Sequence, residues 1–204
     1  LNYIPVALLV NPSMINVKNL DEFVTYVKAR PGEVSYGSPG FGATTHLIGE
    51  LIEVHLGLDM EAVHYQGSAP SRADLIGNHL PVDISAPINY NDELKSGKAI
   101  ALAINGDVRL GAYPDIPTFT ELGYPELAAA GFAAFVAPKG TPAEITETLS
   151  KAIAKALEAP SVRDRLVADA TIPAPTTPAE MREIVKRDTA TWKKAIDAAG
   201  ITFD

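Results

Sequence analysis

The chain has 204 residues, a formal net charge of −8 at pH 7 and no cysteine, and 47% of its residues are hydrophobic. This length and hydrophobic content suffice for one ordinary domain, or for two small lobes that share a chain. The acidic excess argues against a general nucleic-acid binder, which needs a basic surface to neutralise phosphates. The lack of cysteine excludes disulfide frameworks, thiolate zinc sites, iron–sulfur clusters and cysteine nucleophiles.

The first ten residues superficially resemble a secretion signal, but they lack a basic leading segment and an A-x-A cleavage site. We therefore predict a buried strand here and no signal peptide in this chain. Nowhere does an apolar run approach the roughly 18 residues that a membrane-spanning helix requires. Because the first residue is Leu rather than Met, we expect that the chain is processed or belongs to something longer.

Short β-rich runs alternate with helical patterns through the first half of the chain. Strands are predicted at residues 6–10, 34–37, 60–64, 82–84 and 99–104. Asn19 stands three residues before Glu22, as in a helix-capping box. The spacing of Leu47, Leu51 and Val54 predicts one buried stripe of a second helix. Repeated strand–turn–helix units of this kind predict a parallel or mixed sheet covered by helices.

The second half is mostly helical. Its sequence predicts a strand at 131–138 and a helix at 161–166. Three capping boxes are predicted, formed by Thr118 and Glu121, Thr141 and Glu144, and Thr177 and Glu180. The first box belongs to a short helix in a turn-rich link, and the other two open longer helices that carry Ile145, Leu149, Trp192 and Ile196 on their apolar faces. These helices need a sheet to pack on, and the strands predicted nearby are too few to provide one.

Two strand-to-helix turns are the candidate binding features, at residues 38–45 and 66–69. Each consists of small residues followed by a helix, whose first N–H groups have no partner inside the helix and whose dipole adds partial positive charge. If their strands are neighbours, both turns lie at one sheet edge, where open α/β folds bind ligands. A carboxylate or phosphate is the natural guest. A turn of this composition can equally be an ordinary connection.

The sequence gives little support for nucleotide binding, metal binding or catalysis. The turn at 38–45 has no Lys-Ser/Thr pair of a P-loop, and Thr45 replaces the third glycine of a dinucleotide fingerprint. The four histidines show no metal-ligand spacing, so we predict no metal and no cofactor. His46, in the first turn of its helix, could hydrogen-bond within that turn. Asp74 and Asp83 could be read as a carboxylate pair, but acidic residues on a helix are usually solvated, and we predict no enzyme.

Several motifs in order resemble one known family. They are S-P-G-x-G-x-x-x-H-L at 38–47, Y-x-G-S-A-P at 65–70, D-L-x-G at 74–77, V-D at 82–83, P-D-I-P-T-F-T-E-L-G at 114–123 and V-A-P-K-G-T-P at 136–142. Together they closely resemble the Bug family, the extracytoplasmic solute receptors of tripartite tricarboxylate transporters. The resemblance covers nearly the whole chain.

The resemblance implies an α/β fold of the type II periplasmic-binding-protein class, with two lobes joined by a hinge, and a periplasmic location. It implies a small carboxylate ligand (a di- or tricarboxylate, an acidic amino acid or an aromatic acid), which is passed to membrane permease subunits. The ligand-binding residues implied are Ser38, Gly40, Gly42, Ala43, Thr44, Gly67 and Ser68. Family members often have Ser or Thr where this chain has Ala43, a hydroxyl that Thr44 or Thr45 could replace, and they usually have Pro where it has His64.

The resemblance also implies that part of the fold is missing, because receptors of this family are about half as long again. We expect residues 1–128 to form the complete second lobe and residues 129–204 the returning, mostly helical half of the first lobe. Such a fragment would expose apolar surface unless another chain covers it.

Three alternatives stay open. The first is an effector-sensing domain of a regulator with the same two-lobe fold. The second is a hydrolase that uses Ser38 or Ser68 with a histidine and an acid. The third is a truncated chain that binds its ligand weakly or not at all.

Overall fold

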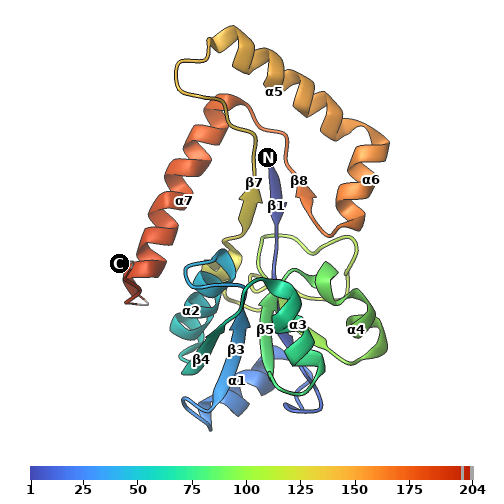
Figure 1. Ribbon diagram of the computed structural model, residues 1–204, viewed down its shortest axis with the longest axis vertical. Coiled ribbons are helices and arrows are strands. Elements are labelled where there is room, and N and C mark those ends of the chain that lie inside the picture. Colours follow the sequence, from blue (N-terminus) through green and yellow to red (C-terminus); the bar gives the residue numbers. More distant parts are fainter. Residues whose placement is uncertain (199, 203–204) are drawn as a thin grey trace.

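The computed structural model describes residues 1–198 and 200–202, without the side chain of residue 198 (Figure 1). In chain order its elements are β1 (Asn2–Ile4), β2 (Ala7–Val10), α1 (Leu20–Lys28), β3 (Val34–Ser38), α2 (Thr44–Leu56), β4 (Met60–His64), α3 (Ser68–Ile76), β5 (Val82–Ser85), the 3-10 helix η1 (Pro87–Tyr90), α4 (Asn91–Ser96), β6 (Ile100–Ile104), the 3-10 helix η2 (Pro125–Ala128), β7 (Gly131–Ala133), α5 (Ala143–Glu158), α6 (Pro160–Ala168), β8 (Ile172–Pro173) and α7 (Pro178–Ala198). The alternation of strands and helices predicted for the first half is confirmed. None of the described helices is both long and apolar enough to cross a membrane.

The first half forms a five-stranded sheet with the order β4-β3-β5-β2-β6. β3 runs parallel to both β4 and β5, whereas β2 runs antiparallel to β5 and β6. The sheet is therefore mixed, one of the two forms predicted. Because β3 and β4 are parallel neighbours, with Ser38 opposite His64, the turns that follow them leave the same edge.

Helices cover both faces of this sheet, which makes its strands the middle layer of three. On one face, Phe23 of α1 and Ile52 of α2 pack against Leu8 of β2, and all three side chains are fully buried. On the other, Leu75 of α3 packs with Leu9 of β2. Successive residues of a strand point to opposite faces, so Leu8 and Leu9 join different cores. This double burial explains why β2 reads as a continuous apolar run.

A second sheet, with the order β7-β1-β8, is antiparallel and has three strands. Figure 1 shows α5, α6 and α7 around this sheet, with α7 descending beside α2. No residue of α5 or α6 is buried. Leu149 of α5 is 51% exposed, while Trp192 of α7 packs against the core of the first half. The predicted shortage of strands for these helices is therefore confirmed over the described residues.

The strand predicted at 131–138 is only partly present. β7 ends at Ala133, and Phe135 and Val136 beyond it are 83% and 90% exposed. The physical reason is pairing, because β1 offers only three residues opposite β7. An apolar run forms a strand only where another strand can accept its hydrogen bonds.

The capping predictions have mixed outcomes. The Thr177–Glu180 box is confirmed, since Glu180 N–H donates to the Thr177 hydroxyl at 3.2 Å and Thr177 N–H donates to the Glu180 carboxylate at 2.8 Å. The Thr118–Glu121 box also forms, but it closes turns and not a helix. The Thr141 box is wrong: α5 begins at Ala143 with Pro142 as its N-cap, and the Thr141 hydroxyl donates instead to the Pro138 carbonyl at 2.8 Å.

Two further sequence predictions concern α1 and α2. Asn19 does cap α1, accepting a hydrogen bond from Glu22 N–H at 2.9 Å. In the second helix Leu47 and Leu51 are buried as expected, but Val54 is 48% exposed. The prediction that Val54 belongs to the buried stripe is therefore wrong.

One buried side chain links the chain segments that pass between the two sheets. Asn105, which follows β6, accepts a hydrogen bond from Val6 N–H at 2.7 Å and donates to the Ala129 carbonyl at 2.6 Å. Asn105 is fully buried. The segment before β2 and the segment before β7 are thus tied to the same amide. The division into units 1–128 and 129–204 stays a prediction, and its last residue, Asp204, lies outside the described residues.

Candidate ligand site at two helix N-termini

The two small-residue turns lie side by side. Tyr65 N–H donates to the Ser38 carbonyl at 2.8 Å, and Gly67 N–H donates to the Pro39 carbonyl at 3.1 Å. These backbone bonds continue the pairing of β3 with β4 beyond the last residues of both strands. The expected proximity of the turns is therefore confirmed.

Both helices begin at these turns without a side-chain cap. α2 starts at Thr44 after the N-cap residue Ala43, and α3 starts at Ser68 after Gly67; neither N-cap makes a capping hydrogen bond. The first N–H groups of each helix therefore lack both an intrahelical partner and a cap. Gly67 has φ of 103°, and a Cβ at this position would meet no atom within 4 Å. A ligand can reach the backbone closely at this point.

Some of the candidate residues are already engaged by the protein. The side chain of Ser38 is buried, and its hydroxyl donates to the Gly40 carbonyl at 3.0 Å. Ala43 N–H also donates to the Gly40 carbonyl, at 3.2 Å, which closes the turn. Thr44 is exposed, whereas the Thr45 hydroxyl is buried with no hydrogen-bond partner among the described residues. Of these two threonines, only Thr44 offers its side chain to the surface.

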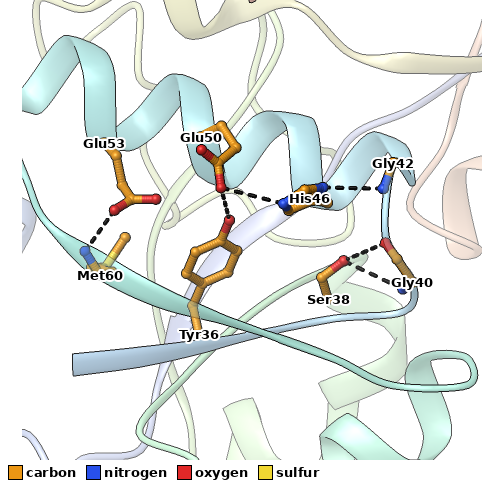
Figure 2. A network of polar contacts seen from close by, with 8 residues as sticks. All are labelled: Tyr36, Ser38, Gly40, Gly42, His46, Glu50, Glu53 and Met60. Atoms are coloured by element: carbon orange, nitrogen blue, oxygen red, sulfur yellow. Dashed lines mark hydrogen bonds and ion pairs between the residues drawn. The ribbon is translucent and has the colours of Figure 1, made fainter. Parts of the chain in front are cut away.

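A chain of polar contacts fixes the first turn against the sheet (Figure 2). Gly42 N–H donates to His46 Nδ1 at 3.1 Å, and His46 Nε2 lies 3.3 Å from Glu50 Oε1. The same carboxylate oxygen accepts a hydrogen bond from the Tyr36 hydroxyl of β3 at 2.8 Å. The hydrogen bond expected of His46 within its turn is therefore confirmed. Gly49, one turn along α2, faces the Tyr36 ring so closely that any Cβ there would overlap it.

Three rings gather at the outer side of this turn. The His46 ring lies 4.5 Å from that of His64 and 5.2 Å from that of Phe41, and Phe41 lies 5.4 Å from His64. Burial lowers the pKa of His46, opposed by the Glu50 carboxylate and reinforced by His64. The net direction favours the neutral imidazole.

The sequence did not predict that Phe41, His64, Glu50 and Tyr36 would surround His46. The one available signal is strand register. Once β3 and β4 are paired in parallel, Ser38 lies opposite His64, which places that imidazole beside the first turn. Pairing of this kind is a tertiary property, and the spacing of the residues along the chain does not contain it.

The part of the candidate site at the start of α2 faces the second sheet. Thr44 lines a groove of about 570 Å³ together with Gly131 and Phe132 of β7 and Val185 and Trp192 of α7. A Cβ at Gly131 would lie 3.3 Å from the Thr44 methyl carbon. The start of α2 thus lies where the two sheets approach each other.

Ser38, Ser68 and the two aspartates Asp74 and Asp83 can be judged by their contacts among the described residues. Neither the Ser38 nor the Ser68 hydroxyl is hydrogen-bonded to a histidine there, and no cluster of three metal-ligating side chains occurs. Asp74 accepts a hydrogen bond from Tyr65 at 2.9 Å, and Asp83 accepts one from Tyr90 at 2.6 Å. The two carboxylates are thus held by different tyrosines.

The chain is similar in sequence and fold to known proteins of one family. Residues 1–201 match the family described as "Tripartite tricarboxylate transporter family receptor" (TctC). The chain is 32% identical to Protein BugT of Bordetella pertussis over 97% of its own length and 60% of that protein. Its fold is similar to that of an R. palustris protein solved with adipate (TM-score 0.86, 30% identity, 98% of this chain and 67% of that one). It is also similar to MatC from Rhodopseudomonas palustris with bound malate (TM-score 0.80, 27% identity, 96% and 67%).

Two further similar structures are described as a periplasmic transporter (TM-score 0.82, 31% identity, 98% of this chain and 65% of that one) and as the periplasmic binding protein BugD (TM-score 0.82, 26% identity, 98% and 67%). The matched family is one of receptors and not of enzymes. The chain spans about 60% of the length of BugT and about two thirds of the solved structures. The α/β fold is shared with these solved structures, and the family match covers residues 1–201. The chain therefore belongs to the receptor family of the tripartite tricarboxylate transporters.

Proposed function

We propose that this chain takes part in the capture of a small carboxylate for a tripartite tricarboxylate-type transporter in the periplasm, and that it is not an enzyme. The observation that carries the proposal is the pairing of the turns, which sets the uncapped N-termini of α2 and α3 next to each other. Two helix N-termini at one place favour an anion through N–H donors and through both dipoles. The net charge of −8 is compatible with this, because solvent screens distant charges over roughly 8–10 Å.

We propose that the ligand carboxylate contacts the main-chain N–H groups and hydroxyls of Thr44 and Ser68, the first residues of the two helices. Gly40 and Gly67 allow it to approach, and Ser38 and Ala43 shape the turn from inside. The N–H of Gly42 is bound by His46, so we assign Gly42 a part in the turn's geometry. The roles are assigned in this way because the Gly42 N–H already has a partner in the protein, whereas the first N–H groups of the two helices have no side-chain cap.

The ligand class is testable by titration calorimetry at pH 7. Because two similar structures carry adipate and malate, these dicarboxylates head the panel, followed by citrate, glutamate and benzoate. We expect measurable heat with at least one carboxylate and none with 1,6-hexanediol, which has the length of adipate and no charge. Absence of binding by every carboxylate would contradict the proposal and favour a chain that does not bind by itself.

We further propose that another chain covers the apolar surface of the second part. Phe135, Val136, Ile145 and Leu149 lie within one stretch of sequence and expose large apolar side chains. Large exposed apolar side chains favour contact with another chain. We expect self-association that strengthens with concentration in sedimentation velocity. Leu149→Gln should weaken it, whereas the control Lys151→Gln, at an exposed charged position of the same helix, should not. A monomer at every concentration would contradict this proposal.

A further inference from the structure

We infer that His46 is the positioning residue of the first turn, and that it acts as a neutral imidazole with its proton on Nε2. In this form it holds Gly42 in place and thereby sets the direction of the N–H groups that begin α2. Its effect on a ligand rests on the proposed function, whereas its effect on the turn does not.

The His46 ring is held by contacts at both of its nitrogens, and the residue is only 3% exposed. Gly42 N–H can only donate, so Nδ1, which lies 3.1 Å from it, must carry a lone pair. A neutral histidine with a free Nδ1 has its proton on Nε2, and Nε2 faces Glu50 Oε1 at 3.3 Å. Both nitrogens therefore agree on one tautomer.

Glu50 fixes the ring from the other side. Its Oε1 accepts from the Tyr36 hydroxyl of β3, so the carboxylate is anchored to the sheet and not only to its own helix. Tyr36 is fully buried, and Gly49 leaves its ring no room to move toward α2. A continuous series of polar contacts thus runs from Tyr36 on the sheet through Glu50 and His46 to Gly42 in the first turn.

Gly42 is the element that this chain controls. It has φ of 70°, in the left-handed region, two residues before α2 begins at Thr44. A bond to its N–H restrains the orientation of the peptide that leads into the helix. Without this acceptor, the N–H would have to turn toward solvent, and the turn would lose its fixed geometry.

Protonation removes the acceptor. The titratable groups that face His46 are Glu50 on its own helix and His64 on β4, while Tyr36 of β3 acts through Glu50. Burial and His64 lower the pKa of His46, and Glu50 opposes them. A second proton on Nδ1 would point directly at Gly42 N–H and break the contact. Acid should therefore loosen the turn as the ring becomes charged.

The first test needs no substitution. In ¹⁵N NMR of the unaltered protein at pH 7, we expect the His46 nitrogens to show the Nε2–H tautomer. During acid titration, the Gly42 amide resonance should shift with the same midpoint as the His46 ring. A charged ring or the Nδ1–H tautomer at pH 7 would overturn the inference, as would a Gly42 amide that does not follow His46.

The second test uses two variants, one that keeps a contact on the Gly42 side of residue 46 and one that keeps a contact on the Glu50 side. Asn in place of His46 sets an oxygen near the position of Nδ1, whereas Gln sets its amide near Nε2. His46→Asn should keep the Gly42 amide protected from hydrogen exchange, and His46→Gln should lose that protection although its link toward Glu50 is kept. Equal protection in both variants, or the reverse order, would overturn the role of Nδ1.

Adipate titration then separates this inference from the proposed function. If adipate binds, His46→Gln should weaken it about 10-fold, the cost of roughly one hydrogen bond, and His46→Asn should stay near the unaltered affinity. Equal affinities in the two variants would overturn the link between turn and ligand. If adipate does not bind the unaltered protein while Gly42 protection follows the expected order, the assignment of adipate fails and the role of His46 in the turn stands.

Discussion

Replacing Gly67 by Asp should abolish binding of whichever carboxylate the panel identifies. Gly67 directly precedes α3, and the space where its Cβ would stand is open, so a new side chain would enter the region we assign to the ligand. A carboxylate there would repel the ligand's charge and could itself accept from the free N–H groups of the helix. Like charges placed together cost several kcal/mol, so we expect an affinity loss of at least about 100-fold by calorimetry.

The matched control for this change is Gly67→Asn. At φ of 103° both side chains strain the backbone to a similar degree, roughly 1–3 kcal/mol, so strain affects the two variants alike. Asn has nearly the size of Asp without the charge, and the difference between them measures electrostatics alone. Equal affinity in the Asp variant and in the unaltered protein would remove this turn from the site, and equal loss in both variants would assign the effect to backbone strain.

Replacing Asp83 by Asn should change how stability depends on pH. Asp83 is fully buried on β5; it accepts hydrogen bonds from Tyr90 and Ser71 on one oxygen, and the other oxygen has no partner among the described residues. Burial raises the pKa of Asp83 from 3.8 to about 7, although hydrogen bonds from Tyr90, Ser71 and the Ile84 backbone lower it. The carboxyl group therefore keeps its proton in the folded protein over a range where it ionises in the unfolded chain.

The direction of the effect follows from proton binding. Between about pH 4 and pH 7 the folded state holds more protons at Asp83 than the unfolded state, so this group's contribution to stability falls as pH rises and is constant above pH 7. Across this pH range, the contribution of Asp83 to the free energy of unfolding falls by an amount on the order of 4 kcal/mol. Urea unfolding from pH 4 to pH 8 should show Asp83→Asn gaining stability relative to the unaltered protein by about this amount.

Asp164→Asn, on the exposed helix α6, is the control for removing an acidic group in general. It should run parallel to the unaltered protein across the pH range. If Asp83→Asn also runs parallel, the Asp83 carboxyl group ionises over the same pH range in the folded and unfolded states, contrary to the expectation.

Much of the fold follows from local sequence signals. β4 spans Met60–His64, the range that the apolar pattern predicts, and Asn19 caps α1 because its acceptor oxygen stands three residues before Glu22. Local patterns do not show which strands pair with each other or in which direction. The antiparallel direction of β2 depends on strands 70 to 100 residues away in sequence, and β7 ends early because β1 pairs with only three of its residues.

For the candidate site, too, local sequence signals predict some features and miss others. The positions of the two turns could be predicted because each follows a strand and precedes a helix with few large side chains. Which donors remain for a ligand could not be predicted, because Ser38 and Gly42 are engaged by groups that only the folded turn brings to them. The same holds for His64, which reaches His46 through the pairing of two strands.

The amide of Asn105 gives the arrangement of the two sheets a specific weak point. Its oxygen and nitrogen hold the Val6 N–H and the Ala129 carbonyl, which belong to different passages of the chain between the sheets. A protein cut after residue 128 would keep the whole five-stranded sheet and lose the acceptor for this buried amide. Excising that unit would therefore remove the acceptor of the Asn105 amide nitrogen, and water would have to take the place of the Ala129 carbonyl.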